Sequence, residues 1–234
     1  MDIKEYFQKI NSQSQQIFSK TLEDYSQDVA KTHHLSANLF EFSENLFDTN
    51  EKELLQTVAL QIESATFSLT LGLYRQSFAT LRLSLEMALA AAYFSINKLE
   101  HHEWLKGSAD IKWSKLIDKE SGVLSTRFVN AFFSGLSPYI SDYNGRAVSV
   151  YRSLSEYVHG NNETWSLSGK ELTIKTDLVE NFFQYTVEIS EIISFVLSCR
   201  YITFFTAHQL ESVESCITNL SHLEPIRVLF GGPK

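Results

Sequence analysis

The sequence predicts an all-α protein, and three of its features support that fold class. Only 3 prolines and 9 glycines interrupt the 234 residues, so most elements should be long and unbroken. The chain is rich in Leu, Glu, Gln and Ala, which favour helix over sheet. Apolar residues recur every three to four positions, the period of a helix with one buried face. We therefore expect a helical bundle.

Residues 1–48 are predicted to form an N-terminal helical arm. Its apolar side chains follow a helical period, at Ile3, Phe7, Ile10, Ile17 and Leu22. The arm is expected to be one long helix, or two helices with a break near His33-His34. The next helix should begin after Asn50, because Asn50 followed by Glu53 resembles a capping box.

Residues 49–210 are predicted to form the main helical domain, and residues 211–234 a C-terminal tail. The helices of the domain are expected at about 51–71, 74–98, 101–106, 110–120, 123–135, 145–159 and 178–209. Asp177 should cap the last of them. Residues 163–175 break the helical period and alternate in polarity like a small β-hairpin insertion. The tail is expected to add a short helix before Pro225.

Composition narrows the function classes. With 44% hydrophobic residues, the chain can build one large core. The net charge of −8 argues against broad, nonspecific coating of nucleic acid, although it leaves room for a small basic site. The motifs of dinucleotide-binding proteins, NTPases, zinc proteases and α/β-hydrolases are absent from the sequence.

The sequence favours a cytoplasmic protein without a membrane partner. Cys199 and Cys216 show no paired spacing, as expected of free thiols in a reducing compartment. The first residues contain no apolar signal-peptide region. The most apolar stretches, Phe78–Phe94 and Ile192–Ala207, contain charged residues and are short for a membrane span, so we expect both to be buried core helices.

The most informative segment is Tyr151–Gly160, the predicted end of a helix. Arg152, Glu156 and His159 are spaced by four and three, which brings Glu156 and His159 to within roughly 40° of Arg152 around a helix. One face would then carry a fixed cation, a carboxylate and the side chain that titrates nearest neutrality. The alternative is a surface salt-bridge face, since Arg and Glu at this spacing commonly pair.

Other polar clusters have simpler interpretations. Arg75, Arg82 and Glu86 form a second stripe, either as a half-buried Arg82–Glu86 pair or with Arg82 lining the same pocket as Arg152. The pairs His33-His34 and His101-His102 are expected to be polar surface, because adjacent helical residues point about 100° apart and no ligand set surrounds them. We therefore expect no metal and no cofactor.

Two sets of residues have the chemistry of nucleic-acid contacts: a group of lysines and a pair of aromatic rings. The alternative is that the lysines are solvated and the rings are packed. Lys112, Lys115 and Lys119 are expected to share a helical face beside Trp113. Tyr157 and Trp165 have the ring type that stacks on bases, although such aromatics more often pack.

The segment containing Arg152, Ser153 and His159 resembles the signature of the HEPN family, an Arg followed by a polar residue and, a few positions later, a His near a helix end. Six residues separate Arg152 from His159. The Arg82–Glu86 segment is similar to an Arg-x-x-x-Glu helix of HEPN-like relatives, and the resemblance covers roughly residues 50–205. It implies an all-α, HEPN-like helical bundle.

The resemblance implies a metal-independent endoribonuclease that acts as a homodimer and brings two copies of the motif together. His159 would move a proton at the 2′-hydroxyl or the leaving oxygen, and Arg152 would stabilise charge on the phosphoryl oxygens. Glu156 would orient the imidazole or hold Arg152. Arg82, Ser153 and Asn161 are the expected substrate-binding residues, and RNA is the expected substrate.

Two functions from different classes remain open. The first is an RNA-cleaving toxin or antiviral defence effector, with a cognate antitoxin or another protein as partner. The second is a catalytically inactive HEPN-like module for protein–protein interaction or nucleotide binding. The acidic composition favours the second, as does Ser153, which stands where active relatives often carry Asn, Asp or His. The aligned Arg152, Glu156 and His159 favour the first.

Overall fold

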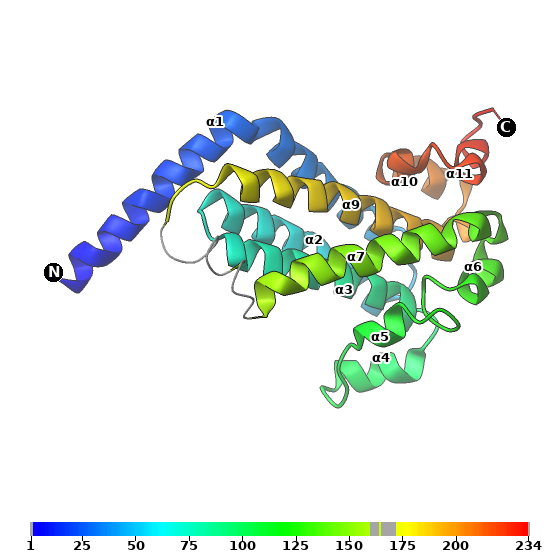
Figure 1. Ribbon diagram of the computed structural model, residues 1–234. Helices are drawn as coiled ribbons and strands as arrows, with labels where there is room; N and C mark the ends of the chain where they lie inside the picture. The colour runs from blue at the N-terminus through cyan, green and yellow to red at the C-terminus, as the bar shows by residue number, and fades with distance from the viewer. Residues whose placement is uncertain (1, 160–163, 165–171, 234) are drawn as a thin grey trace.

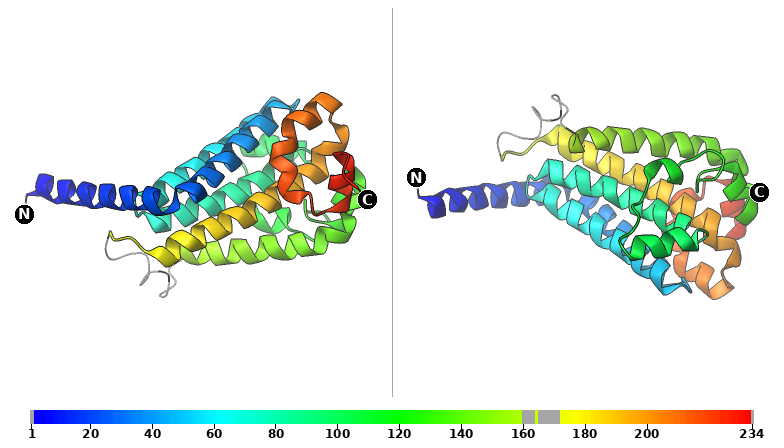
Figure 2. Two further views of the ribbon diagram at one scale, coloured as in Figure 1. Left: turned by 90° about the horizontal axis from the view of Figure 1, so that it is seen from above. Right: turned by 90° about the horizontal axis from the view of Figure 1, so that it is seen from below.

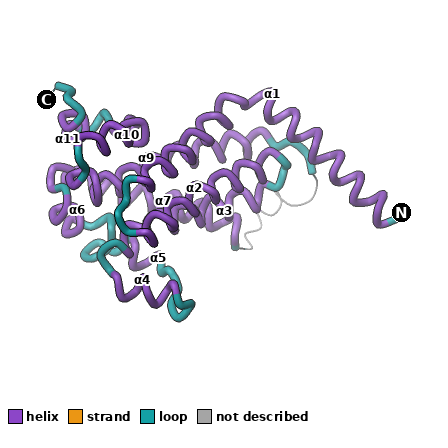
Figure 3. Tube along the Cα trace, turned by 180° about the vertical axis from the view of Figure 1, so that it is seen from behind, coloured by secondary structure: helices purple, strands orange, loops and turns teal. Residues whose placement is uncertain are grey.

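A computed structural model describes residues 2–159, 164 and 172–233 of the chain (Figure 1). The predicted all-α class is confirmed, because these residues form helices and connecting loops and contain no strand (Figure 3). Most of the predicted hairpin lies outside the described residues, and residues 172–175, which lie inside them, carry no strand.

Five helices form the body of the molecule: α1 (Ile3–Glu44), α2 (Thr49–Thr70), α3 (Tyr74–Phe94), α7 (Ile140–Val158) and α9 (Thr176–Tyr201). Shorter elements connect and cover them: α4 (Lys98–Leu105), α5 (Trp113–Leu116), α6 (Thr126–Phe132), η1 (Ser134–Tyr139), η2 (Ile202–Phe204), α10 (Ala207–Ile217), η3 (Thr218–Leu220) and α11 (Glu224–Leu229). None of the helices in the described ranges carries an apolar stretch long enough to cross a bilayer.

The long helices lie side by side, with α3 and α9 at the centre. Helix α2 packs between α1 and α3, while α3 also contacts α7 and α9. Helices α1, α6, α7 and α10 pack around α9. The N-terminal part of α1 extends beyond this bundle, and α10 and α11 lie at the opposite end (Figure 2).

The buried helices are the two apolar stretches of the sequence. In α3, the small residues Ala88–Ala92 with Leu89 are at most 2% exposed and allow neighbouring helices to approach closely. In α9, every residue from Ile192 to Cys199 is at most 1% exposed, including Ser194 and Ser198. The second stretch is shorter than expected, because α9 ends at Tyr201 and Phe204 of η2 is exposed.

Helix α1 bends at Tyr25, whose backbone leaves the helical region at φ −128° and ψ 23°. The predicted break near His33-His34 is therefore wrong, because both residues lie within a regular part of the helix. The bend coincides with the contact between the ring of Tyr25 and that of Phe183 in α9, 6.0 Å apart. Beyond the bend, α1 runs along the bundle and buries Leu35, Leu39 and Phe42.

Helices α2, α7 and α9 begin at residues other than the expected ones. Asp48, not Asn50, caps α2, because its carboxylate accepts from the amides of Asn50 and Glu51 at 2.9 and 3.2 Å. Helix α7 begins five residues early, at Ile140, where η1 already turns the chain. Lys175, not Asp177, precedes the first residue of α9, and its side chain makes no capping bond.

Arg146 fixes the position of α7 on α9. Its guanidinium donates to both carboxylate oxygens of Glu188, at 2.5 and 3.0 Å, and to both of Glu191, each at 2.9 Å. The hydroxyl of Tyr143 donates to Glu191 at 2.8 Å. Arg146 holds the pKa of Glu191 below its ordinary value. Two bidentate pairs at one point restrict sliding of α7 along α9.

His101 is not the surface residue that the sequence suggested. It is 2% exposed, and its ring stacks on Phe94 with 4.8 Å between centroids and 4° between planes. Burial lowers the pKa of its imidazole.

This burial predicts a stability that falls on mild acidification. Unfolded, His101 takes up a proton near its ordinary pKa of about 6.5, whereas the folded value lies lower. Between these two values the unfolded state binds more protons, so the free energy of unfolding decreases as pH falls through that window. We expect His101→Phe to reduce this slope, measured by urea unfolding between about pH 7.5 and 5.5. The exposed His208→Phe is the control, and an unchanged slope in His101→Phe would contradict the assignment.

Candidate functional site

The predicted catalytic face lies at the C-terminal end of α7. Arg152, Glu156 and His159 are all exposed. His159 is the C-cap residue, with φ −82° and ψ 155°, so the helix ends one residue earlier than expected. Its amide still donates to the carbonyl of Ser155 at 2.9 Å. Because φ remains close to helical and only ψ departs, the Cβ of His159 keeps its place on the helix surface beside Arg152 and Glu156.

These three side chains have no intramolecular partner in the described part of the chain. Neither a hydrogen bond nor an ion pair joins Arg152, Glu156 or the His159 imidazole to another described residue. The surface salt-bridge alternative therefore lacks its contact. The other arginine of α7, Arg146, makes four bonds to carboxylates.

Arg82 contacts the neighbouring stripe of α7. Its Nε donates to Ser155 Oγ at 2.9 Å, and its Nη2 donates to the hydroxyl of Tyr151. Its guanidinium carbon lies 4.3 Å from the centre of the Tyr151 ring. Since Tyr151 and Arg152 point about 100° apart, Arg82 is bound beside the predicted catalytic face and makes no direct contact with Arg152.

Arg82 and Glu86 form the half-buried pair that was one of the two interpretations. Their charged groups are 3.9 Å apart, with side chains 21% and 14% exposed. Burial raises the pKa of Glu86, and the charge of Arg82 opposes that shift. The chemistry of this cluster is that of a packed polar contact between α3 and α7.

Trp113 and its lysines do not form the expected basic helical face. Helix α5 is a single turn, Trp113–Leu116, so Lys112 and Lys119 lie outside it. Lys115 pairs with Glu100 at 2.8 Å. The indole of Trp113 stacks on Tyr151 at 3.7 Å and 3°. Tyr151 is thus held between Trp113 and Arg82, and Trp113 is committed to packing.

The remaining expected site residues fall into two groups. Ser153 is partly buried on α7, and Tyr157 packs on Phe78 with 4.0 Å between ring centres. Asn161 and Trp165 lie outside the described residues. Val158, in the last turn of α7, is 41% exposed.

Metal-ligating groups do not converge in the described ranges, where no cluster of three or more His, Cys, Asp or Glu has suitable geometry. His33 instead pairs with Glu63 at 2.7 Å on the surface. Cys199 and Cys216 are buried, and burial raises the pKa of both thiols.

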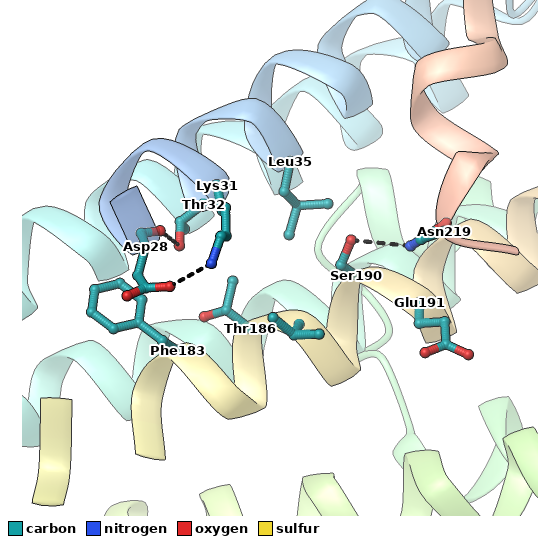
Figure 4. A pocket seen from close by; sticks show the side chains of 10 residues that line it. Asp28, Lys31, Thr32, Leu35, Phe183, Thr186, Ser190, Glu191 and Asn219 are labelled. Atoms are coloured by element: carbon teal, nitrogen blue, oxygen red, sulfur yellow. Dashed lines mark hydrogen bonds and ion pairs between the residues drawn. The ribbon is translucent and has the colours of Figure 1, made fainter. Parts of the chain in front are cut away.

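A small pocket of about 150 Å³ lies between α1 and α9 (Figure 4). Leu35, Phe183 and Val187 form its apolar wall, together with two threonines whose hydroxyls bond to carbonyls of their own helices, Thr32 and Thr186. Sequence analysis missed this pocket, because its lining comes from segments far apart in the chain. It contains no nucleophile with an activating neighbour.

Sequence analysis also missed the role of Arg75. Its Nη2 donates to the carbonyl oxygen of His159 at 3.1 Å. The spacing of seven between Arg75 and Arg82 was the available signal, because it places both on the α3 stripe that faces α7. No family model, curated protein or solved structure matches this chain.

The contrast between Arg82 and Arg152 predicts different costs of truncation. Arg82→Ala removes two hydrogen bonds and leaves Glu86 half-buried without its cation, so we expect a loss of about 2 kcal/mol in the free energy of unfolding. Arg152→Ala removes an exposed side chain without a described partner and should change it by less than about 0.5 kcal/mol. Urea unfolding of both variants measures this, and equal losses would contradict the described contacts.

Proposed function

We propose that this protein is a metal-independent endoribonuclease of HEPN type, acting as a toxin or antiviral defence effector. The observation that carries the proposal is the exposed face of Arg152, Glu156 and His159, which has no partner among the described residues. A cation, a carboxylate and an imidazole that make no hydrogen bond or ion pair with another described residue are available for a substrate.

The chemistry of these groups suits cleavage of RNA. His159 would take the proton of the 2′-hydroxyl, or give one to the leaving 5′-oxygen. Arg152 would stabilise the negative charge that develops on the phosphoryl oxygens. Glu156 would orient one of these two groups. Because the nucleophile is the 2′-hydroxyl, the products would be a 2′,3′-cyclic phosphate and a 5′-hydroxyl, and DNA would not react.

The proposal includes a homodimer. Arg152, Glu156 and His159 are all exposed, and none of them lines the pocket between α1 and α9. An open helix surface surrounds a substrate poorly and does not exclude water. A second copy of the same face would supply the opposite wall of a cleft and a second set of charges.

A second candidate function has its own supporting observation. In the N-terminal arm, Ile3 is 67% exposed, Tyr6 43% and Phe7 61%. An apolar stripe at helical spacing on an extended helix suits contact with a protein. This favours the inactive HEPN-like module, in which the chain contributes an interface and no chemistry.

We expect the protein to sediment as a dimer at micromolar concentration. If the arm forms part of the interface, Phe7→Glu should shift the equilibrium toward monomer, because it places a charge within an apolar contact. Leu99→Glu, at another exposed apolar site, is the control. Sedimentation velocity measures both, and a monomeric wild type would contradict the proposed cleft.

We expect purified protein to cleave single-stranded RNA in the presence of EDTA. His159→Ala and Arg152→Ala should each lower the rate by about 10²-fold, the usual scale for losing an acid–base group or a charge-stabilising donor. Glu156→Gln should cost less, because its role is orientation. Toxicity on overexpression should disappear with His159→Ala.

Arg127→Ala is a matched control, since this arginine is also exposed but lies on α6. A wild type that cleaves no RNA, together with a His159→Ala variant that melts well below it, would support the inactive module. Activity that EDTA abolishes and magnesium restores would contradict the proposed chemistry.

A further inference from the structure

The carbonyl of His159, at the end of α7, accepts a hydrogen bond from a residue of another helix. The last carbonyls of a helix point away from its body and lack intrahelical donors. Arg75 of α3 donates to this carbonyl from Nη2 at 3.1 Å. The amide of the same residue is bonded to Ser155 at 2.9 Å. Both polar groups of the His159 backbone are thus occupied.

Arg75 and Arg82 connect α3 to α7 by hydrogen bonds at two levels, which we call the two rungs. Arg82 follows Arg75 by seven positions on α3; Arg75 contacts His159, and Arg82 contacts Ser155 and Tyr151. The order is antiparallel, and seven residues of helix rise about 10.5 Å. Ser155 and Tyr151 lie four and eight residues before His159, a rise of about 6 and 12 Å that brackets the distance between the two arginines, so both rungs fit one register of the two helices.

The second rung is itself fixed by packing. Tyr151 lies between the guanidinium of Arg82, 4.3 Å from its ring centre, and the indole of Trp113, 3.7 Å away. Ser155 Oγ also donates to the carbonyl of Tyr151 at 2.6 Å. The last turns of α7 are therefore anchored one turn before His159 and again at His159.

We propose that Arg75 is a positioning residue that anchors the His159 backbone, with Arg82 anchoring the turn that precedes it. The consequence for catalysis rests on the proposed function. A fixed backbone holds the exposed imidazole at a constant distance from Arg152, which matters most in the transition state. Loss of the anchor should therefore lower kcat more than it changes KM.

The test compares three variants of the full chain. Arg75→Gln removes the charge and shortens the donor. Arg75→Lys keeps a cation that can reach the His159 carbonyl, so it should retain most of the anchoring that Arg75→Gln loses. Arg127→Gln makes the same chemical change at an exposed arginine of α6 and is the matched control.

The first readout needs no activity. Amide hydrogen exchange, measured by NMR, should show the His159 amide exchanging about tenfold faster in Arg75→Gln. The variant loses the charged donor to the His159 carbonyl, so the helix end opens more often and exposes the amide that is bonded to Ser155. Amides of α9 should not change. The imidazole resonance of His159, assigned from His159→Ala, should shift or broaden in the same variant.

The second readout is RNA cleavage, with kcat and KM measured separately. A fall in kcat of about tenfold at similar KM, with recovery in Arg75→Lys, supports the positioning role. Wild-type cleavage with unchanged exchange and kcat in Arg75→Gln overturns this inference and leaves the proposed function standing. A wild type without cleavage, but with faster exchange in Arg75→Gln, overturns the proposed function and leaves the anchor standing.

Discussion

The arrangement of the bundle depends on the burial of Met87–Phe94 in α3 and Ile192–Cys199 in α9, where the side chains are buried in every direction around the helix. Each fully buried Leu, Ile or Phe gains about 1.5–3 kcal/mol relative to exposure, so neither segment can leave one side in water. Helices α1, α2, α7 and α10 cover them. The polar residues of the covering helices are then confined to outer faces and to the seams between helices.

Polar contacts between the helices set the register of α7 against its neighbours, which apolar burial alone does not determine. Apolar packing is non-directional, whereas a bidentate Arg–carboxylate contact permits one geometry. Arg146 joins the N-terminal half of α7 to α9, and Arg82 and Arg75 join its C-terminal half to α3. A partly buried ion pair adds little net stability, because desolvation offsets much of the attraction. Its contribution here is to place the end of α7.

The same seams explain why Arg152 differs from its neighbours. Arg75, Arg82 and Arg146 point toward other helices and meet acceptors there, whereas Arg152 lies on the outer face of α7 with Glu156 and His159. The described residues provide no second wall for this face. Any chemistry that it performs therefore requires a substrate or a second subunit to complete the site.

The sequence by itself determined the fold class, the two buried helices and the shared face of Arg152, Glu156 and His159. These follow from local periodicity, because residues three to four apart share a helix face in any context. The tertiary structure decided the bend at Tyr25, the burial of His101, the stacking of Trp113 on Tyr151 and the anchoring of His159 by Arg75. Each of these depends on a contact between residues distant in the chain, and helical periodicity contains no information about which helices become neighbours.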